Sequence, residues 1–150
     1  MQSLPADLVI KSLEGNLIAV VEVKNLKDLS REEAIEMRRL LLNYGFPSDV
    51  PYFLLLSQEV GFLWKEAKPN DFDAAPTYEF PMDKVVIRYS EGKPAARRLY
   101  GAELELLVLQ WLTNLATKPQ RPIEEPETTL AHAGFNDSIK GASVFFGEAA

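Results

Sequence analysis

Apolar and polar positions near the start of the chain predict two paired strands. Residues 7–13 and 17–24 are β-rich runs, separated at 14–16 by Glu-Gly-Asn, a short glycine-containing link typical of a hairpin. The second run is apolar on both faces through residues 18–21, so we expect a central strand that is covered on both sides. Its charged residues come only at its end.

A helix is predicted next, from about residue 31 to residue 44. Ser30 and Glu33 have the spacing of a capping box, and apolar residues follow at helical spacing. After this helix, residues 52–56 form an apolar run that predicts a buried strand, and residues 61–64 are its expected hairpin partner. Strand, helix and strand thus alternate, which is typical of an α/β domain.

The second half of the chain is dominated by one long helix. Residues 99–116 carry an apolar stripe at a period of 3.6, which predicts a long amphipathic helix. Before it, residues 65–84 contain three prolines among Asp and Asn and predict an irregular connection, while residues 85–87 predict a short strand. The remaining segments are a Pro- and Glu-rich link at 118–127, a short helical pattern at 128–140 and an expected edge strand at 143–146.

Length and composition indicate a single domain. The chain has 150 residues, of which 47% are apolar and 25% charged, values close to those of an ordinary soluble domain. One core is expected over residues 1–150, with a motif-bearing part at about 1–90 and a C-terminal helix and tail at about 91–150. We therefore predict an α/β fold with a mixed central sheet, flanked by the helix at 31–44 and packed against the helix at 99–116.

Charge and residue usage exclude several classes of protein. The net charge of −6 argues against a strongly basic nucleic-acid binder, although a local basic patch can still act within a Debye length. The absence of Cys excludes disulfides, thiolate zinc sites and cysteine nucleophiles, and the single His132 excludes His-rich metal cages. Neither a leader-like N-terminus nor a run of about 20 apolar residues is present, so we expect a cytoplasmic protein with no membrane partner.

Three charged residues at the predicted hairpin carry the chemistry. Asp7 begins one strand, and Glu22 and Lys24 end the next. Because side chains alternate along a strand, Glu22 and Lys24 share one face while Val23 points to the other. Antiparallel pairing brings the beginning of one strand beside the end of the next, so Asp7 is expected close to both.

Two adjacent carboxylates favour a hard divalent cation. Such a cation relieves their repulsion, prefers oxygen ligands and keeps several bound waters. It can polarise a phosphodiester and help to generate hydroxide, and Lys24 would lie beside the attacking water. The alternative is a strand without catalytic function whose exposed end carries a solvated ion pair, which contributes little to the stability of the fold.

These residues resemble the PD-(D/E)XK nuclease superfamily, whose pattern is an Asp opening one strand, Glu-x-Lys on the next, then a helix and another strand. Pro5-Ala6-Asp7, Glu22-Val23-Lys24, the helix at 31–44 and the strand at 52–57 match that order, with one residue between Pro5 and Asp7. The resemblance implies that Asp7, Glu22 and the main-chain carbonyl of Val23 bind Mg²⁺ or Mn²⁺. It also implies that Lys24 orients the attacking water.

The same resemblance implies a restriction-endonuclease-like fold, with a mixed central sheet flanked by helices. Only six residues precede Asp7, so the first core helix of that fold, which often bears another acidic ligand, is missing or supplied otherwise. The chain is also similar to uncharacterised bacterial proteins of this fold. The sequence features that carry this similarity are Pro51-Tyr52-Phe53, Phe62-Leu63-Trp64-Lys65, Pro76-Thr77-Tyr78-Glu79 and Ile139-Lys140-Gly141.

Four arginines are candidates for contact with nucleic acid, the partner implied by an active nuclease. Arg38 and Arg39 lie on the helix at 31–44, and Arg97 and Arg98 precede the long helix. Arg binds phosphate through paired hydrogen bonds, but arginines among glutamates on a polar helix face are usually solvated surface.

The sequence thus predicts a Mg²⁺-dependent nuclease. The alternative is a catalytically silent domain of the same fold that acts as a binding or assembly module. A homodimer through the long helix is a further expectation, if its apolar stripe around Trp111 exceeds what one core can bury.

Overall fold

The structure, a computed structural model, describes residues 6–47, 49–68, 70–90, 98–118 and 120–147. Its strands are β1 (Leu8–Lys11), β2 (Leu17–Val23), β3 (Tyr52–Leu56), β4 (Val60–Lys65), β5 (Tyr78–Pro81) and β6 (Ser143–Phe146). Its helices are α1 (Arg31–Asn43), α2 (Asp83–Tyr89), α3 (Gly101–Thr117), α4 (Glu127–His132) and α5 (Phe135–Ser138). The chain is a mixed α/β protein, as the sequence predicts.

The strands form one six-stranded sheet in the order β5-β4-β3-β2-β1-β6. The β2–β3 pair is parallel and the other pairs are antiparallel. The parallel pair exists because α1 carries the chain back across the sheet between β2 and β3. β6 lies at one edge, which confirms the expected edge strand, and β2 lies in the interior of the sheet.

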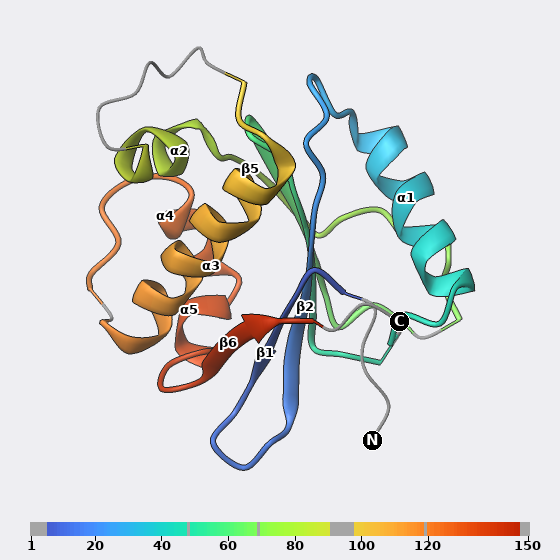
Figure 1. The fold of residues 1–150 in the computed structure, drawn as a ribbon. Coiled ribbons are helices and arrows are strands. Elements are labelled where there is room, and N and C mark those ends of the chain that lie inside the picture. Colours follow the sequence, from blue (N-terminus) through green and yellow to red (C-terminus); the bar gives the residue numbers. More distant parts are fainter. Residues whose placement is uncertain (1–5, 48, 69, 91–97, 119, 148–150) are drawn as a thin grey trace.

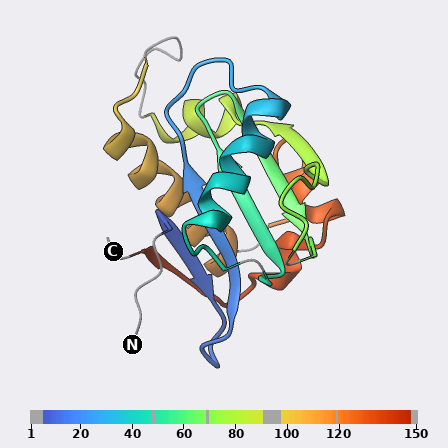
Figure 2. The same cartoon turned by 90° about the vertical axis from the view of Figure 1, so that its right-hand side faces the viewer.

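Helices cover both faces of the sheet: α1 lies on one face, and α2, α3, α4 and α5 lie on the other (Figure 1). The view turned by 90° shows α1 running across the strands of its face (Figure 2). Along β2 the buried side chains alternate between the two cores, with Val20 in the cluster under α1 and Val21 and Val23 in the cluster under α3. The prediction of a central strand covered on both sides is therefore confirmed.

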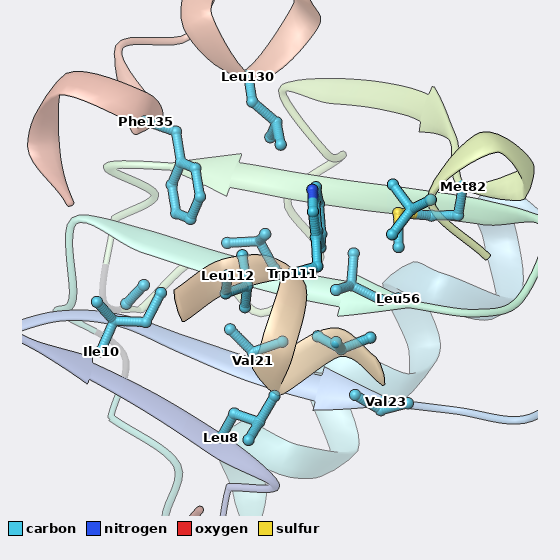
Figure 3. Close-up of a cluster of buried hydrophobic side chains, with 14 of the residues drawn as sticks. Leu8, Ile10, Val21, Val23, Leu56, Met82, Trp111, Leu112, Leu130 and Phe135 are labelled. Carbon is cyan, nitrogen blue, oxygen red and sulfur yellow. The ribbon is translucent and has the colours of Figure 1, made fainter. Parts of the chain in front are cut away.

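The larger core lies between α3 and the sheet. Trp111 and Leu112 of α3 face Val21 and Leu56 of the central strands, with Phe135 of α5 beside them (Figure 3). Trp111 is 1% exposed within a single chain, so the stripe around it needs no second chain to cover it. The reason for expecting a homodimer is thereby weakened, and the homodimer itself stays a prediction.

Two predicted segments are wrong. Residues 85–87 form part of helix α2 rather than a strand, and β5 occupies residues 78–81, which were predicted to be irregular. Three consecutive apolar residues fit a buried helix as well as a strand. Here Val85 and Val86 are buried in the same core as the side chains of α3, while Ile87 is exposed. β5 is short and pairs with β4, where Gly61 leaves room for the ring of Phe80 that any Cβ would overlap.

The predicted helix at 31–44 is confirmed as α1. Its capping box is complete: the Glu33 N–H donates to the Ser30 hydroxyl at 3.1 Å, and the Ser30 N–H donates to the Glu33 carboxylate at 3.0 Å. No helix in the described part of the chain combines the length and apolar character needed to cross a bilayer.

Candidate functional site

Asp7 and the end of β2 meet at one end of the sheet. The antiparallel β1–β2 pairing sets Leu8 opposite Val21, and the same register continued by one residue brings Asp7 beside Glu22. The backbone N–H of Val23 donates to Asp7 Oδ2 at 2.8 Å, and the backbone carbonyl of Asp7 accepts from Gly147 at 3.0 Å. Asp7 is thus held from both sides, by β2 and by the residue that follows β6.

Glu22 is the buried member of the group. It is 5% exposed, and Lys24 Nζ lies 3.4 Å from Glu22 Oε1. Val23 belongs to the core under α3, so Glu22 and Lys24 share the opposite face of β2, as the alternation predicts. The other carboxylate oxygen, Glu22 Oε2, is buried, and no N–H or O–H group of the described residues donates to it.

Burial and a neighbouring carboxylate change the protonation of Glu22. Loss of water contact raises its pKa to about 8, assisted by a hydrogen bond and like charge from Asp7, while the charge of Lys24 acts in the opposite direction. Two carboxyl groups that share a hydrogen bond need one proton between them. At neutral pH this site therefore holds either a proton or another cation.

Glu105 of α3 is a site residue that sequence reasoning missed. Burial raises its pKa, and the charge and a hydrogen bond of Asp7 raise it further, while Lys24 lowers it. Asp7 is therefore the shared neighbour of two glutamates, Glu22 and Glu105. Glu105 lies within the helix predicted at residues 99–116, but no local sequence pattern indicates that this helix approaches Asp7. Glu105 thus brings a carboxyl group from α3 to the Asp7 group.

The position of α3 is set by two side chains that bind one backbone unit. The N–H of Leu99 donates to Gln58 Oε1 at 3.0 Å, and its carbonyl accepts from Asn25 Nδ2 at 2.5 Å. Asn25 follows β2 and Gln58 follows β3, so the ends of the two parallel strands hold the segment that leads into α3. This contact, which we call the Leu99 clamp, places Glu105 beside Asp7.

The arginines predicted to contact nucleic acid lie in different environments. Arg38 is 2% exposed, so its expected surface position is wrong. Its guanidinium donates to the Asp71 carbonyl at 2.9 Å and lies over the rings of Phe53 and Trp64, and burial lowers its pKa. The reason is that the segment following β4 folds back over α1 and covers Arg38.

The remaining arginines are not gathered with Arg38. Arg39 lies 3.7 Å from Asp73, and Arg98 pairs with Glu59. Arg97 lies outside the described residues. Arg98 directly precedes Leu99, which the Leu99 clamp ties to the ends of β2 and β3. Contact of any of these side chains with nucleic acid stays a prediction.

The donor set fits a hard cation of the Mg²⁺ type. Mg²⁺ is bound through one or two carboxylates and retains waters. Glu22 Oε2 beside Asp7 offers carboxylate oxygens at which such an ion could replace the shared proton. In the described ranges, however, three or more His, Cys, Asp or Glu side chains are nowhere arranged as a complete metal-binding group. Asp7 and Glu22 would thus bind such an ion with water or substrate oxygens filling the other positions.

No protein-family model, no curated protein and no solved structure matches this chain. The argument for function consequently depends on the residues of the site and their surroundings.

Proposed function

We propose that this protein is a Mg²⁺-dependent nuclease that hydrolyses phosphodiester bonds in nucleic acid. The observation that carries the proposal is the buried Glu22 Oε2 next to Asp7, to which no described N–H or O–H group donates, with Lys24 at 3.4 Å from the other oxygen of the same carboxylate. A purely structural ion pair has no need of a second carboxylate, because like charges at contact are costly.

Each residue of the group has a distinct part in the proposed reaction. Asp7 and Glu22 would supply carboxylate oxygens to the ion, and the backbone carbonyl of Val23 would be a third donor, as in the PD-(D/E)XK pattern that the sequence resembles. A bound Mg²⁺ would neutralise charge on the phosphodiester and favour hydroxide formation. Lys24 would hold the attacking water through its ammonium group, and Glu105 adds a further carboxyl group beside Asp7.

A cleavage assay on purified protein tests this function. Single-stranded and duplex DNA and RNA are incubated with Mg²⁺ or Mn²⁺, using wild type, Glu22→Gln and Lys24→Ala. Glu14→Gln and Lys27→Ala are matched controls, because both residues are exposed and lie outside the site. We expect metal-dependent cleavage that both site variants abolish and both controls retain. Cleavage that persists undiminished in the site variants would refute the assignment.

A catalytically silent binding or assembly module is the second candidate. It is favoured by the close approach of Lys24 to Glu22, since an ammonium group at 3.4 Å can itself satisfy one of the carboxylate oxygens. The two functions differ in metal binding. Calorimetry with Mn²⁺ showing no heat of binding, together with no cleavage of any substrate, would favour the silent module.

A further inference from the structure

A cavity of about 390 Å³ lies at the other end of α3 from the Asp7 group. It is bounded by α2, the last turns of α3 and the link that leads to α4, the orange segment at the left of Figure 1. Lys118, which follows the last turn of α3, is thirteen positions beyond Glu105, or about 20 Å along a helix axis. The cavity is therefore separate from the candidate metal site.

One wall of the cavity is a network of paired charges around the buried Glu127. Glu127 is 9% exposed. Arg88 Nη2 donates to its Oε1 at 2.9 Å and to its Oε2 at 2.7 Å, and Trp111 Nε1 also donates to Oε2, at 2.9 Å. Glu124 lies 3.7 Å from Arg88 Nε and 3.6 Å from Lys84 Nζ. The two glutamates offset the charges of Arg88 and Lys84, so this wall is fixed and close to neutral.

The mouth of the cavity has an excess of positive charge. Lys118 and Arg121 line it, and within the described part of the chain neither forms an ion pair or a side-chain hydrogen bond. Two uncompensated cations at one cavity stand out in a chain whose net charge is −6.

Apolar and amide groups complete the lining. Leu115 and Ile123 line the cavity, and Ile123 is 87% exposed, which leaves its side chain open to contact by a ligand. Gln120 adds an amide that has no partner of its own among the described residues. A cavity with apolar surface and a few polar groups at its mouth is typical of small-molecule sites, and its volume lies within their usual range of about 300–1,000 Å³.

We propose that this cavity binds a small organic phosphate monoester, with its phosphate on Lys118 and Arg121 and its flat or apolar body against Leu115 and Ile123. Two cations suit a dianionic phosphate better than a monocarboxylate, and the Arg121 guanidinium can donate two parallel hydrogen bonds to it. Arg88 is already paired with Glu127, so Lys118 and Arg121 are the cations that remain to bind the phosphate. This site does not depend on the proposed nuclease activity.

Titration with adenosine 5′-monophosphate, followed by ¹H–¹⁵N NMR without added divalent metal, tests the site. We expect saturable shifts of the Trp111 indole N–H and of the Lys118 and Arg121 amides, with the Trp64 indole on the other face of the sheet unchanged. The double variant Lys118→Glu/Arg121→Glu should weaken binding at least about tenfold, because charged hydrogen bonds are lost. Lys27→Glu/Arg31→Glu makes the same change of charge at exposed positions outside the cavity and should leave the affinity unchanged.

Two companion probes separate the parts of the ligand. Adenosine should bind at least about tenfold more weakly than its monophosphate, since it lacks the charged group. Inorganic phosphate should also bind more weakly, since it makes no contact with Leu115 and Ile123. The absence of saturable shifts at millimolar monophosphate, or equal binding by the two double variants, would overturn the proposal. Phosphate that binds as tightly as the nucleotide would overturn the role of the apolar wall.

Discussion

Asp7 accepts a hydrogen bond from the backbone N–H of Val23 at 2.8 Å, across the β1–β2 hairpin and sixteen positions along the chain. This single contact ties the first carboxylate of the site to the strand that carries the second. Asp7 also raises the pKa of Glu22 on β2 and of Glu105 on α3, so its charge acts on carboxyl groups of two different elements. Asp7 is therefore the residue whose replacement should change the site most.

Asp7→Asn should lower the pKa of Glu22 from about 8 towards its usual range. The substitution removes the like charge of Asp7, although burial of Glu22 continues to raise the pKa. The measurement is the titration of the Glu22 carboxyl carbon by ¹³C NMR in both proteins. Asp28→Asn, at an exposed loop position, is the control and should leave the titration unchanged. A Glu22 titration identical in wild type and Asp7→Asn would contradict the contact.

Glu22 should make the folded protein less stable as pH rises. Its folded-state pKa of about 8 lies above the value of 4.5 for a free side chain, so the folded state holds a proton that the unfolded state releases. Stability from this group is complete below about pH 4.5 and is lost as pH rises through 8. Glu22→Gln removes the titration. Urea unfolding should thus show the variant gaining stability relative to wild type between pH 5 and pH 8, and an unchanged difference would refute the prediction.

Mg²⁺ should offset that loss at high pH. An ion that binds the folded state alone stabilises it by about 1.4 kcal/mol when its concentration is about tenfold above Kd. Thermal unfolding at pH 8 with and without Mg²⁺ measures this gain. Asp7→Asn should reduce or abolish it, while Glu14→Gln on the exposed hairpin should retain it. An equal shift of Tm in Asp7→Asn would place the bound ion elsewhere.

The strands and the first helix could be predicted because their signals are local. The hairpin around Gly15 and the capping box of Ser30 and Glu33 depend on residues within a few positions of each other. Asp7 could be placed near Glu22 for the same reason, since antiparallel pairing follows from a short hairpin. The strand predicted at residues 85–87 was wrong because an apolar run of three residues is too short to show the periodicity that separates a helix from a strand.

Glu105 and the Leu99 clamp could not be predicted because tertiary packing creates them. Gln58 and Leu99 are forty-one positions apart, and no pattern in either segment indicates that they meet. Arg38 illustrates the same limit: its neighbours on α1 are charged, but the chain after β4 returns over it and buries it. Such placements depend on which surfaces the core brings together, a non-local property.

Gln58→Leu should destabilise the protein by about 1–3 kcal/mol, the usual cost of leaving a buried backbone N–H without a partner. It should also displace the start of α3, because the Leu99 clamp then retains only Asn25. Urea unfolding measures the first effect, and the NMR titration of Glu105 measures the second. Gln120→Leu is a matched control at an exposed position. Equal stability of the two variants would show that the clamp contributes nothing.

Arg38→Ala should lower stability far more than Arg39→Ala, although the two residues are adjacent on α1. Arg38 is buried over Phe53 and Trp64 and binds the Asp71 carbonyl, so its loss removes packing, a cation–π contact and a charged hydrogen bond, together about 2–4 kcal/mol. Arg39 is exposed beside Asp73, and a surface ion pair of this kind contributes about 0–1 kcal/mol. Urea unfolding of both variants provides the comparison. If Arg38 instead served nucleic acid from the surface, its replacement would weaken binding to DNA or RNA and leave the unfolding midpoint in place.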